Sequence, residues 1–330
     1  LSMFAAIYVE KEIKQHPRTL EILSRFSNLP VIDCERYGEV FNRNAQNFRI
    51  QKQLPSLILA KKFGNLVLPT PEGYGFEGQG SYYFSHMMNC VYDCRYCFLQ
   101  GMYRSANTVL FVNYEDFYFD LERYIKNTNN AGNYYSGYDC DSLALEPVSH
   151  FCQFFLPLFR KYPNAMLEIR TKSTQVRGLL EAQALNNVIV AMSFASEAAT
   201  ARWEHKVPSL KKRLEALVKL QKNGWPVALR FEPIIYTETV LEEYTALFKL
   251  VFSSLNAEKL HSVSLGEFRM PTEFYKNISK LYSDEALYAQ PINVQEGEVS
   301  LKDNSGGATI EKLEAMLSEF ISPTQYYRCA

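Results

Sequence analysis

Three cysteines lie within eight residues of this 330-residue chain and restrict its chemistry more than any other feature. Cys90, Cys94 and Cys97 are spaced C-x3-C-x2-C, directly after a run with the pattern of a β-strand. In barrels of alternating strands and helices, the loop that follows a strand is where active sites form. Three cysteines on a cubane cluster leave one iron without a protein ligand. The spacing therefore predicts a [4Fe–4S] cluster with one iron open to a small molecule.

An open iron can bind the amino and carboxylate groups of S-adenosylmethionine. One electron from the cluster then breaks the sulfonium carbon–sulfur bond and gives a 5′-deoxyadenosyl radical. The alternative is a structural zinc ion with His86 or Cys140 as its fourth ligand. Structural zinc favours pairs of close ligands, and the chain has no second C-x2-C pair and no H-x3-H pair. We therefore favour the iron–sulfur cluster over zinc.

Short apolar runs alternate with helical patterns from residue 81 onward, which implies a parallel sheet built by right-handed crossovers. Six such units are too few for a closed eightfold barrel. We therefore predict an α/β fold in which residues 81–270 form a partial (β/α)6 barrel, with the active site at the C-terminal ends of its strands. The expected strands are Ser81–Met88, Tyr138–Leu145, Ala165–Thr171, Asn187–Ala195, Val227–Ile235 and His261–Gly266.

The two ends of the chain are expected to extend this barrel. Residues 1–80 read as a small mixed α/β extension with a hairpin near Ser56–Gly75. Residues 271–330 read as a C-terminal extension packed on the barrel, with helices at Thr272–Tyr282 and Thr309–Phe320.

Charge and hydropathy exclude some classes of protein. Thirty-five basic residues balance 36 acidic ones, for a net charge of −1, which is not the strongly basic composition of a nucleic-acid coating protein. Six basic residues between Glu35 and Lys62 form either a solvated surface or a phosphate track. No apolar run approaches the ~20 residues needed to cross a bilayer. The first 13 residues lack the basic region of a signal peptide, so we expect a cytoplasmic protein.

The cysteine motif, with an aromatic residue before its last cysteine, resembles the signature of the radical S-adenosylmethionine superfamily. Its surroundings are similar to the spore photoproduct lyases, DNA-repair enzymes that reverse a thymine–thymine adduct formed by UV light. The shared features are Cys97-Phe-Leu-Gln100 and the helix entry Val112-Asn-Tyr-Glu-Asp116. The resemblance runs from about Ile7 to the C-terminus. It implies hydrogen abstraction from the adduct, β-scission and return of a hydrogen from a cysteine.

The resemblance also implies roles for single residues. Cys140 would donate the hydrogen atom, because an S–H bond is weak enough to quench a carbon radical; considered alone, it reads as a buried core cysteine. Single serines, lysines or arginines at strand ends are otherwise ordinary loop or ion-pair residues. The implied cofactor contacts are Ser142, Lys172, Ser193 and Ser196, the implied radical relay is Tyr96, and the implied substrate contact is Arg269.

Two positions depart from the family pattern. Phe98 stands where the lyases have a second relay tyrosine, and without an O–H hydrogen we expect slow radical return and consumption of S-adenosylmethionine. Leu143 stands where an acid is common, which predicts a different substrate pocket. These departures keep open a radical enzyme acting on another nucleic acid or a small molecule, and a third reading is a non-catalytic metal-binding protein. The expected partners are UV-damaged DNA and a reductant such as flavodoxin or ferredoxin.

Overall fold

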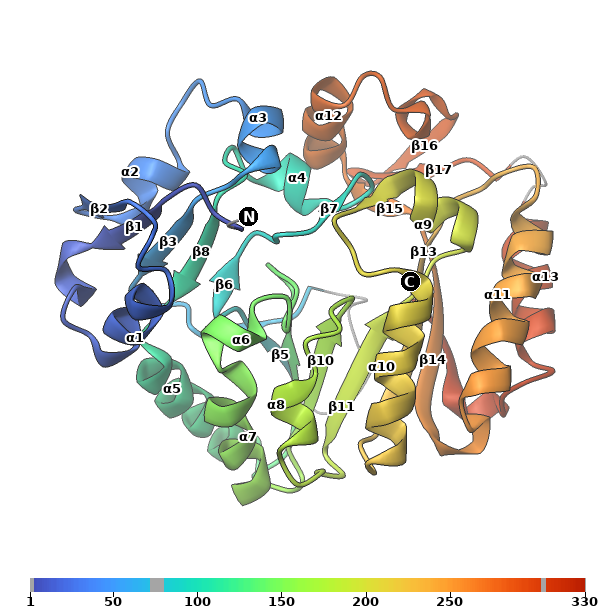
Figure 1. Cartoon of the computed structure of the whole chain (residues 1–330). Helices are drawn as coiled ribbons and strands as arrows, with labels where there is room; N and C mark the ends of the chain where they lie inside the picture. Colours follow the sequence, from blue (N-terminus) through green and yellow to red (C-terminus); the bar gives the residue numbers. More distant parts are fainter. Residues whose placement is uncertain (1–2, 72–79, 304–306, 330) are drawn as a thin grey trace.

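The larger of the two main sheets is an open, mostly parallel one (Figure 1). The computed structural model describes residues 3–71, 80–303 and 307–329. Within them, only the β4–β5 pair of this sheet is antiparallel. In spatial order its strands are β18 (Tyr326–Cys329), β14 (Leu260–Glu267), β13 (Val227–Ile234), β11 (Val188–Ser193), β10 (Met166–Thr171), β9 (Asn133–Ser136), β5 (Ser81–Phe84) and β4 (Leu68–Pro69). Among the described residues the two end strands, β18 and β4, do not pair with each other, so the predicted α/β class with a partial barrel is confirmed.

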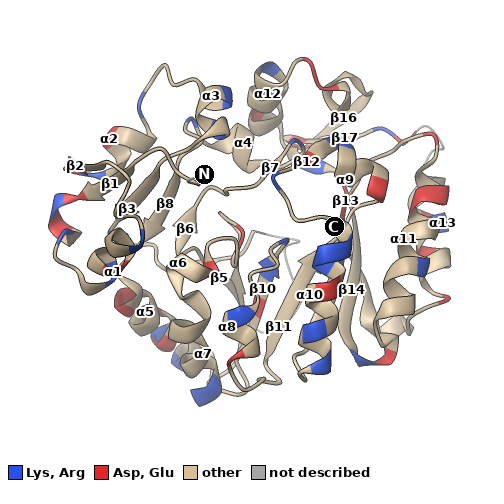
Figure 2. Ribbon diagram, in the orientation of Figure 1, with Lys and Arg blue, Asp and Glu red and all other residues tan. Residues whose placement is uncertain are grey.

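The helices that follow the strands cover the outer face of this sheet (Figure 1). In α10 (Leu210–Lys222), leucines at helical spacing are buried while most of the charged residues between them face outward. Figure 2 shows this segregation, with charges along the helices and few on the sheet except on β10. The other covering helices are α6 (Glu146–Ser149), α7 (Phe151–Lys161), α8 (Arg177–Leu180) and α11 (Val240–Ser254). Helix α9 (Glu197–Trp203) lies at the C-terminal ends of the strands, near β15 (Arg269–Pro271) in Figure 1.

The second barrel strand lies earlier in the chain than the sequence predicts. Tyr138–Leu145 is not a strand, because β9 ends at Ser136 and Gly137 turns the chain with φ +87°. A Cβ at Gly137 would lie 2.6 Å from the Ser142 hydroxyl and 2.9 Å from the Arg170 carbonyl, so only glycine fits this turn. Residues 138–145 form a buried loop. A further parallel strand, β18, was not predicted.

The N-terminal part of the chain forms a second sheet, seen at the left of Figure 1. The predicted hairpin near Ser56–Gly75 is wrong for its described residues, because β3 and β4 belong to different sheets; residues 72–75 lie outside the described part. The predicted strand Ser81–Met88 is also divided between the two sheets. The second sheet has the order β2 (Val31–Cys34), β1 (Ile7–Glu10), β3 (Leu57–Ala60), β8 (Thr108–Phe111) and β6 (Met87–Met88).

The helices of the N-terminal part are α1 (Pro17–Arg25), α2 (Tyr37–Phe41) and α3 (Phe48–Gln53). Helix α5 (Tyr114–Asn127) lies in the connection from β5 to β9 and packs on α7. Two strands of the second sheet, β6 and β8, come from beyond residue 80. The domain limits at residues 80 and 270 stay predictions. Short 3-10 helices occur at Lys11–Ile13 (η1), Ala257–Lys259 (η2), Ala286–Ala289 (η3) and Pro323–Gln325 (η4).

The C-terminal extension combines helices with a small antiparallel sheet. Its elements are α12 (Thr272–Leu281), α13 (Ala308–Leu317), and the strands β15 (Arg269–Pro271), β17 (Glu298–Leu301) and β16 (Ile292–Gln295). Helix α12 packs on the short helix α4 (Leu99–Met102) at Gly101, where a Cβ would lie 2.2 Å from the Phe274 carbonyl oxygen. The extension therefore supports the segment that follows the cysteine motif. No helix in the described residues is long and apolar enough to span a membrane.

Candidate functional site

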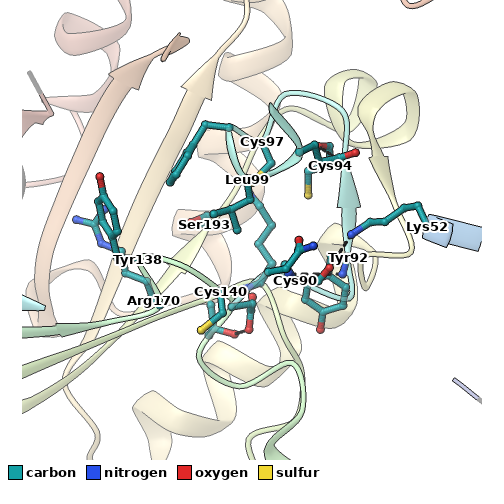
Figure 3. A pocket seen from close by; sticks show the side chains of 17 residues that line it. Lys52, Cys90, Tyr92, Cys94, Cys97, Leu99, Tyr138, Cys140, Arg170 and Ser193 are labelled. Atoms are coloured by element: carbon teal, nitrogen blue, oxygen red, sulfur yellow. Dashed lines mark hydrogen bonds between the residues drawn. The ribbon is translucent and has the colours of Figure 1, made fainter. Parts of the chain in front are cut away.

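One pocket at the C-terminal ends of the barrel strands collects the cysteines of the motif and Cys140 (Figure 3). In the figure, Lys52 reaches toward Cys90 from one side, and Tyr138 and Cys140 lie on the other. The predicted residues that line the pocket are Cys90, Cys94, Cys97, Cys140, Lys172 and Ser193. Further lining residues that the sequence did not single out include Lys52, Tyr92, Tyr138, Asp141 and Arg170.

The loop that carries the motif cysteines begins at Asn89, whose backbone adopts φ +69°, a left-handed conformation that asparagine tolerates. The Asn89 side chain donates to the carbonyls of Ser105 and Asn107 at 2.7 and 3.1 Å. Its backbone N–H donates to the Asp139 carbonyl at 2.8 Å. The cysteine loop is thus tied directly to the loop that carries Cys140.

A short antiparallel strand pair fixes the middle of the cysteine loop. Strand β7 (Asp93–Cys94) pairs antiparallel with β12 (Glu204–His205), so that Cys94 lies opposite Glu204. The Gln100 amide also donates to the Cys94 carbonyl at 2.6 Å. These contacts fix the backbone of the loop.

The three motif cysteines fit a cubane cluster. They are free thiols on one loop that line one pocket, and the backbone N–H of Tyr92 donates to Cys90 Sγ at 3.4 Å. Burial raises the pKa of Cys90 to about 12 and holds the pKa of Cys94 and Cys97 above the usual range. Iron must therefore displace the thiol protons when it binds. The three thiolates would ligate three different irons and need not converge on one ion.

One of the two candidates for the fourth ligand of a zinc ion, His86, lies away from the motif cysteines. The His86 ring packs against Phe151, with ring centroids 4.5 Å apart, and it does not line the pocket. Burial lowers the pKa of His86 to about 3, so the ring is neutral. No three His, Cys, Asp or Glu side chains in the described residues are grouped so that they could hold a single metal ion.

Cys140 lies in the pocket on a loop anchored by its neighbour Asp141. The buried Asp141 carboxylate accepts from the Lys172 backbone N–H at 2.6 Å, the Thr171 hydroxyl at 2.7 Å and the Leu143 N–H at 3.0 Å. The loop is thereby fixed to the end of β10. Burial, and then the charge of Asp139, raise the pKa of Cys140 well above its usual range. The thiol keeps its proton, as a hydrogen-atom donor must.

A buried carboxylate, Glu204, links several residues at the pocket. It forms ion pairs with Lys172 Nζ at 3.1 Å and with Arg213 Nη2 at 2.5 Å, and it accepts a hydrogen bond from the Tyr96 hydroxyl. Burial opposes its ionisation, but Lys172 and Arg213 outweigh burial and lower the pKa of Glu204 to about 2. Tyr96 does not line the pocket, so its hydroxyl faces Glu204 instead. No motif around Glu204 signalled this role.

The remaining predicted residues lie outside the pocket lining. The Ser142 hydroxyl lies 2.8 Å from the Ser136 hydroxyl and so links the loop of Cys140 to the end of β9. Ser196 caps α9 and donates to Glu243 at 2.5 Å. Arg269 lies 3.7 Å from Glu298 in the small C-terminal sheet. Their contacts with cofactor or substrate, like the roles of the other predicted residues, stay predictions.

Aromatic side chains form one wall of the pocket. Phe98 stacks on Phe274 with ring centroids 6.2 Å apart and an interplanar angle of 16°. Tyr138 lies 5.9 Å from Phe98 and 4.6 Å from Tyr83. Leu143, the other departure from the family pattern, is fully buried in the core and does not line the pocket.

Comparison with known proteins agrees with this geometry. The family model described as spore photoproduct lyase matches residues 6–289. The spore photoproduct lyase of Bacillus subtilis strain 168 is 22% identical over 263 residues, 78% of this chain and 75% of that protein. The spore photoproduct lyase of Clostridium acetobutylicum is 22% identical over 296 residues, 87% of this chain and 84% of its own.

Solved structures share the fold. A spore photoproduct lyase mutant with bound AdoMet and dinucleoside spore photoproduct aligns with a TM-score of 0.84 at 17% identity, covering 99% of this chain and 98% of its own. A spore photoproduct lyase complexed with the dinucleoside alone aligns with a TM-score of 0.83 at 16% identity and the same coverage. Because the family model spans most of the chain, this protein belongs to the spore photoproduct lyase family.

Proposed function

We propose that this protein repairs a thymine–thymine photoproduct in UV-damaged DNA by radical chemistry. The observation that carries the proposal is the meeting of a protonated Cys140 thiol and the three motif cysteines in one pocket of a chain of this family. Relatives named spore photoproduct lyase, and a structure of one with bound dinucleoside spore photoproduct, support the choice of substrate.

Cys90, Cys94 and Cys97 would hold a [4Fe–4S] cluster, and the pocket beside them would hold S-adenosylmethionine. When bound, these two groups supply a 5′-deoxyadenosyl radical. Lys172 and Ser193 line the pocket, which supports them as the contacts with the cofactor. A related structure with bound AdoMet supports this cofactor. The electron would come from a reductant such as flavodoxin or ferredoxin.

The residues of the chain would then direct the radical to one product. The lesion has to leave the duplex to reach a pocket at the strand ends. Phe98 and Tyr138 offer ring faces on which an extruded base can stack. After hydrogen abstraction and β-scission, the Cys140 S–H would give its hydrogen atom to the thymine radical.

Basic residues of the run between Glu35 and Lys62, together with Arg104 just after α4, are the candidates for contact with the DNA backbone. Arg43 and Arg104 line a polar hollow beside α4 that has no acidic lining residue in the described part of the chain. Two of the expected contacts are already paired: Arg49 with Asp284 at 2.9 Å, and Lys61 with Glu12 at 2.9 Å. We therefore assign the phosphate contacts to Arg43 and Arg104 first.

The test compares Cys140→Ala with a matched variant, Cys152→Ala. Cys152 is also buried with a raised thiol pKa, but it lies in α7 outside the pocket. Reconstituted proteins receive dithionite, S-adenosylmethionine and dinucleoside spore photoproduct without oxygen, and chromatography separates the products. Cys140→Ala should form 5′-deoxyadenosine but divert the thymine radical to other adducts, while Cys152→Ala should repair normally. An unchanged yield of repaired product with Cys140→Ala would remove the donor role.

A second candidate is a radical enzyme that acts on a different nucleic acid or on a small molecule. Phe98 favours it, because it places a ring without a hydroxyl in the pocket wall. The same assay separates the two candidates: 5′-deoxyadenosine without repaired dinucleoside would favour the second. A colourless protein after anaerobic reconstitution with iron and sulfide would favour a non-catalytic zinc-binding protein.

A further inference from the structure

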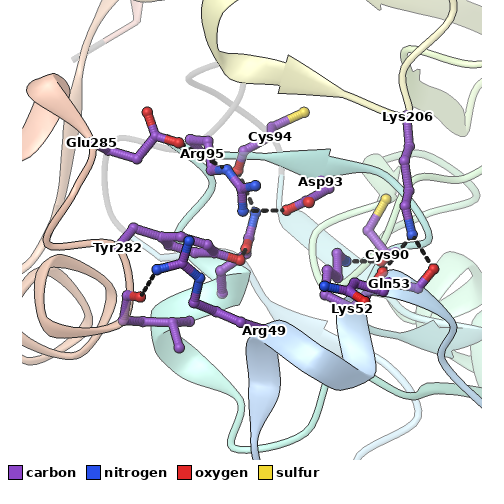
Figure 4. A network of polar contacts seen from close by, with 12 residues as sticks. Arg49, Lys52, Gln53, Cys90, Asp93, Cys94, Arg95, Lys206, Tyr282 and Glu285 are labelled. Carbon is purple, nitrogen blue, oxygen red and sulfur yellow. Dashed lines mark hydrogen bonds and ion pairs between the residues drawn. The ribbon is translucent and has the colours of Figure 1, made fainter.

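Lys52, the fifth residue of α3, is buried against the cysteine loop. Its side chain lines the pocket, and only 3% of the residue is exposed. The ammonium group donates to the Cys90 carbonyl at 2.6 Å (Figures 3 and 4). A buried ammonium is unfavourable unless opposite charge compensates it. The Cys90 carbonyl carries no net charge and supplies only part of that compensation.

Other cations around the loop already face carboxylates. Lys172 faces Glu204 at 3.1 Å, and Arg95 faces Asp93 and Glu285, each at 3.1 Å. Lys52 has no ion pair within 4 Å of its ammonium in the described residues. Among the cations that line the pocket in the described residues, Lys52 is therefore the one without a carboxylate partner, and its charge is available to an anionic group bound by the cysteines.

The backbone around Lys52 is held from a second side. Lys206, which follows β12, donates to the carbonyls of Lys52 and Gln53, the latter at 2.9 Å (Figure 4). Strand β12 itself pairs with the cysteine loop at Cys94. The end of α3, the loop and β12 thus form one connected unit that fixes the ammonium beside Cys90.

The positive charge of Lys52 is fixed next to the first cysteine of the motif, because its buried ammonium group is hydrogen-bonded to the Cys90 carbonyl at 2.6 Å. A fixed positive charge at this place would stabilise each additional negative charge on a cluster.

We propose that Lys52 is a positioning residue that raises the reduction potential of the cluster held by Cys90, Cys94 and Cys97. The inference rests on the cluster in the proposed function and not on its substrate. A cluster that gains one electron from a low-potential donor becomes more negative by one charge. Net charge and hydrogen bonding around a cluster set its potential, so the reduced form gains most from the ammonium.

The test separates charge from hydrogen bonding with three variants at one position. Lys52→Met removes both, Lys52→Gln keeps an N–H donor without charge, and Lys52→Arg keeps the charge. Lys61→Met, which removes a surface lysine paired with Glu12, is the control. Each reconstituted protein is titrated with dithionite without S-adenosylmethionine, and electron paramagnetic resonance measures the reduced cluster. Iron content and thermal unfolding of the metal-free proteins show whether each variant folds and assembles.

At the solution potential where half of the wild-type cluster is reduced, Lys52→Met and Lys52→Gln should show an about tenfold lower ratio of reduced to oxidised cluster. For one electron this corresponds to a potential about 59 mV lower. Lys52→Arg and Lys61→Met should stay within about twofold of the wild type, because they keep the charge beside Cys90.

Two results would overturn the inference: a normal ratio in Lys52→Met with full iron content, or a normal ratio in Lys52→Gln alone. The second would assign Lys52 a hydrogen-bonding role. If Lys52→Met fails to assemble, Lys52→Gln against Lys52→Arg decides. A shifted potential in a protein that repairs nothing would instead leave the inference standing and remove the proposed substrate.

Discussion

The buried ion pair between Glu168 and Arg230 offers a quantitative test of how this fold stabilises buried charge. Glu168 on β10 is 2% exposed and lies inside the sheet with Arg230 of β13, which is fully buried. Its carboxylate accepts from Arg230 Nη2 at 2.8 Å and from Arg170 Nε at 2.7 Å. Arg170 also lines the pocket, so this cluster of charges connects the buried ion pair to the site. The variant Glu168→Gln keeps the shape and removes the negative charge.

The expected loss follows from the pKa. Burial opposes ionisation of Glu168, but Arg230 and Arg170 outweigh it and lower its pKa from 4.5 to about 2. At 1.36 kcal/mol per pKa unit, this difference corresponds to about 3 kcal/mol of stability. Because the folded-state pKa is the lower one, the contribution is complete above pH 4.5 and is lost as the pH falls toward 2. Glu168→Gln should therefore lose about 3 kcal/mol at pH 7, within the range for breaking a buried ion pair.

Urea unfolding of the metal-free protein, followed by circular dichroism, measures this loss. The difference between wild type and Glu168→Gln should be near its full value at pH 5 and about half of it at pH 3. Glu181→Gln removes an exposed ion pair with Arg177 and should change stability by less than about 0.5 kcal/mol. A loss below about 1 kcal/mol at pH 7, or a loss independent of pH between 5 and 3, would refute the reasoning.

Three further predictions concern the residues around the pocket. Gly101→Ala should lower the free energy of unfolding by about 2 kcal/mol, because its Cβ would lie 2.2 Å from a backbone oxygen of α12. The control Gly38→Ala, whose Cβ would meet only a side chain at 3.3 Å, should change this free energy little. Equal losses of unfolding free energy in the two variants would contradict the prediction. Phe98→Tyr should reduce the 5′-deoxyadenosine released per repaired dinucleoside, counted by chromatography, and an unchanged ratio would exclude a relay there. Glu204→Gln should lose about 3 kcal/mol in urea unfolding, because it leaves the buried Arg213 unpaired, and a loss below about 1 kcal/mol would contradict it.

Much of the barrel could be predicted because its central strands carry their own signal. Strand β11 is a nearly continuous apolar run, and in β10 and β13 buried charged residues interrupt the apolar ones. The predicted limits of all three strands differ from the observed ones by at most two residues. Tyr138–Leu145 has a similar composition but is buried as a loop. Its backbone is held by Asp141 rather than by a strand partner, and nothing local distinguishes the two kinds of burial.

The site could be predicted where its residues are close in sequence, and less well elsewhere. The cysteine motif lies within one loop, so its spacing alone identified it. Glu204 acts on Tyr96 across 108 positions, and Lys52 acts on Cys90 across 38. Lys52 also lay in a basic run that reads as surface, although the lysine is buried. Only the fold brings these groups together.

The most direct test of the proposed chemistry follows one hydrogen atom. A thiol hydrogen exchanges with solvent, whereas the carbon-bound hydrogens of 5′-deoxyadenosine do not. Repair in D₂O, with a single turnover and mass spectrometry of the product, therefore reports the source of the returned hydrogen. If Cys140 donates it, the repaired dinucleoside gains one deuterium, and the Cys140→Ala protein gives no such product. Repaired dinucleoside without deuterium would contradict donation by Cys140.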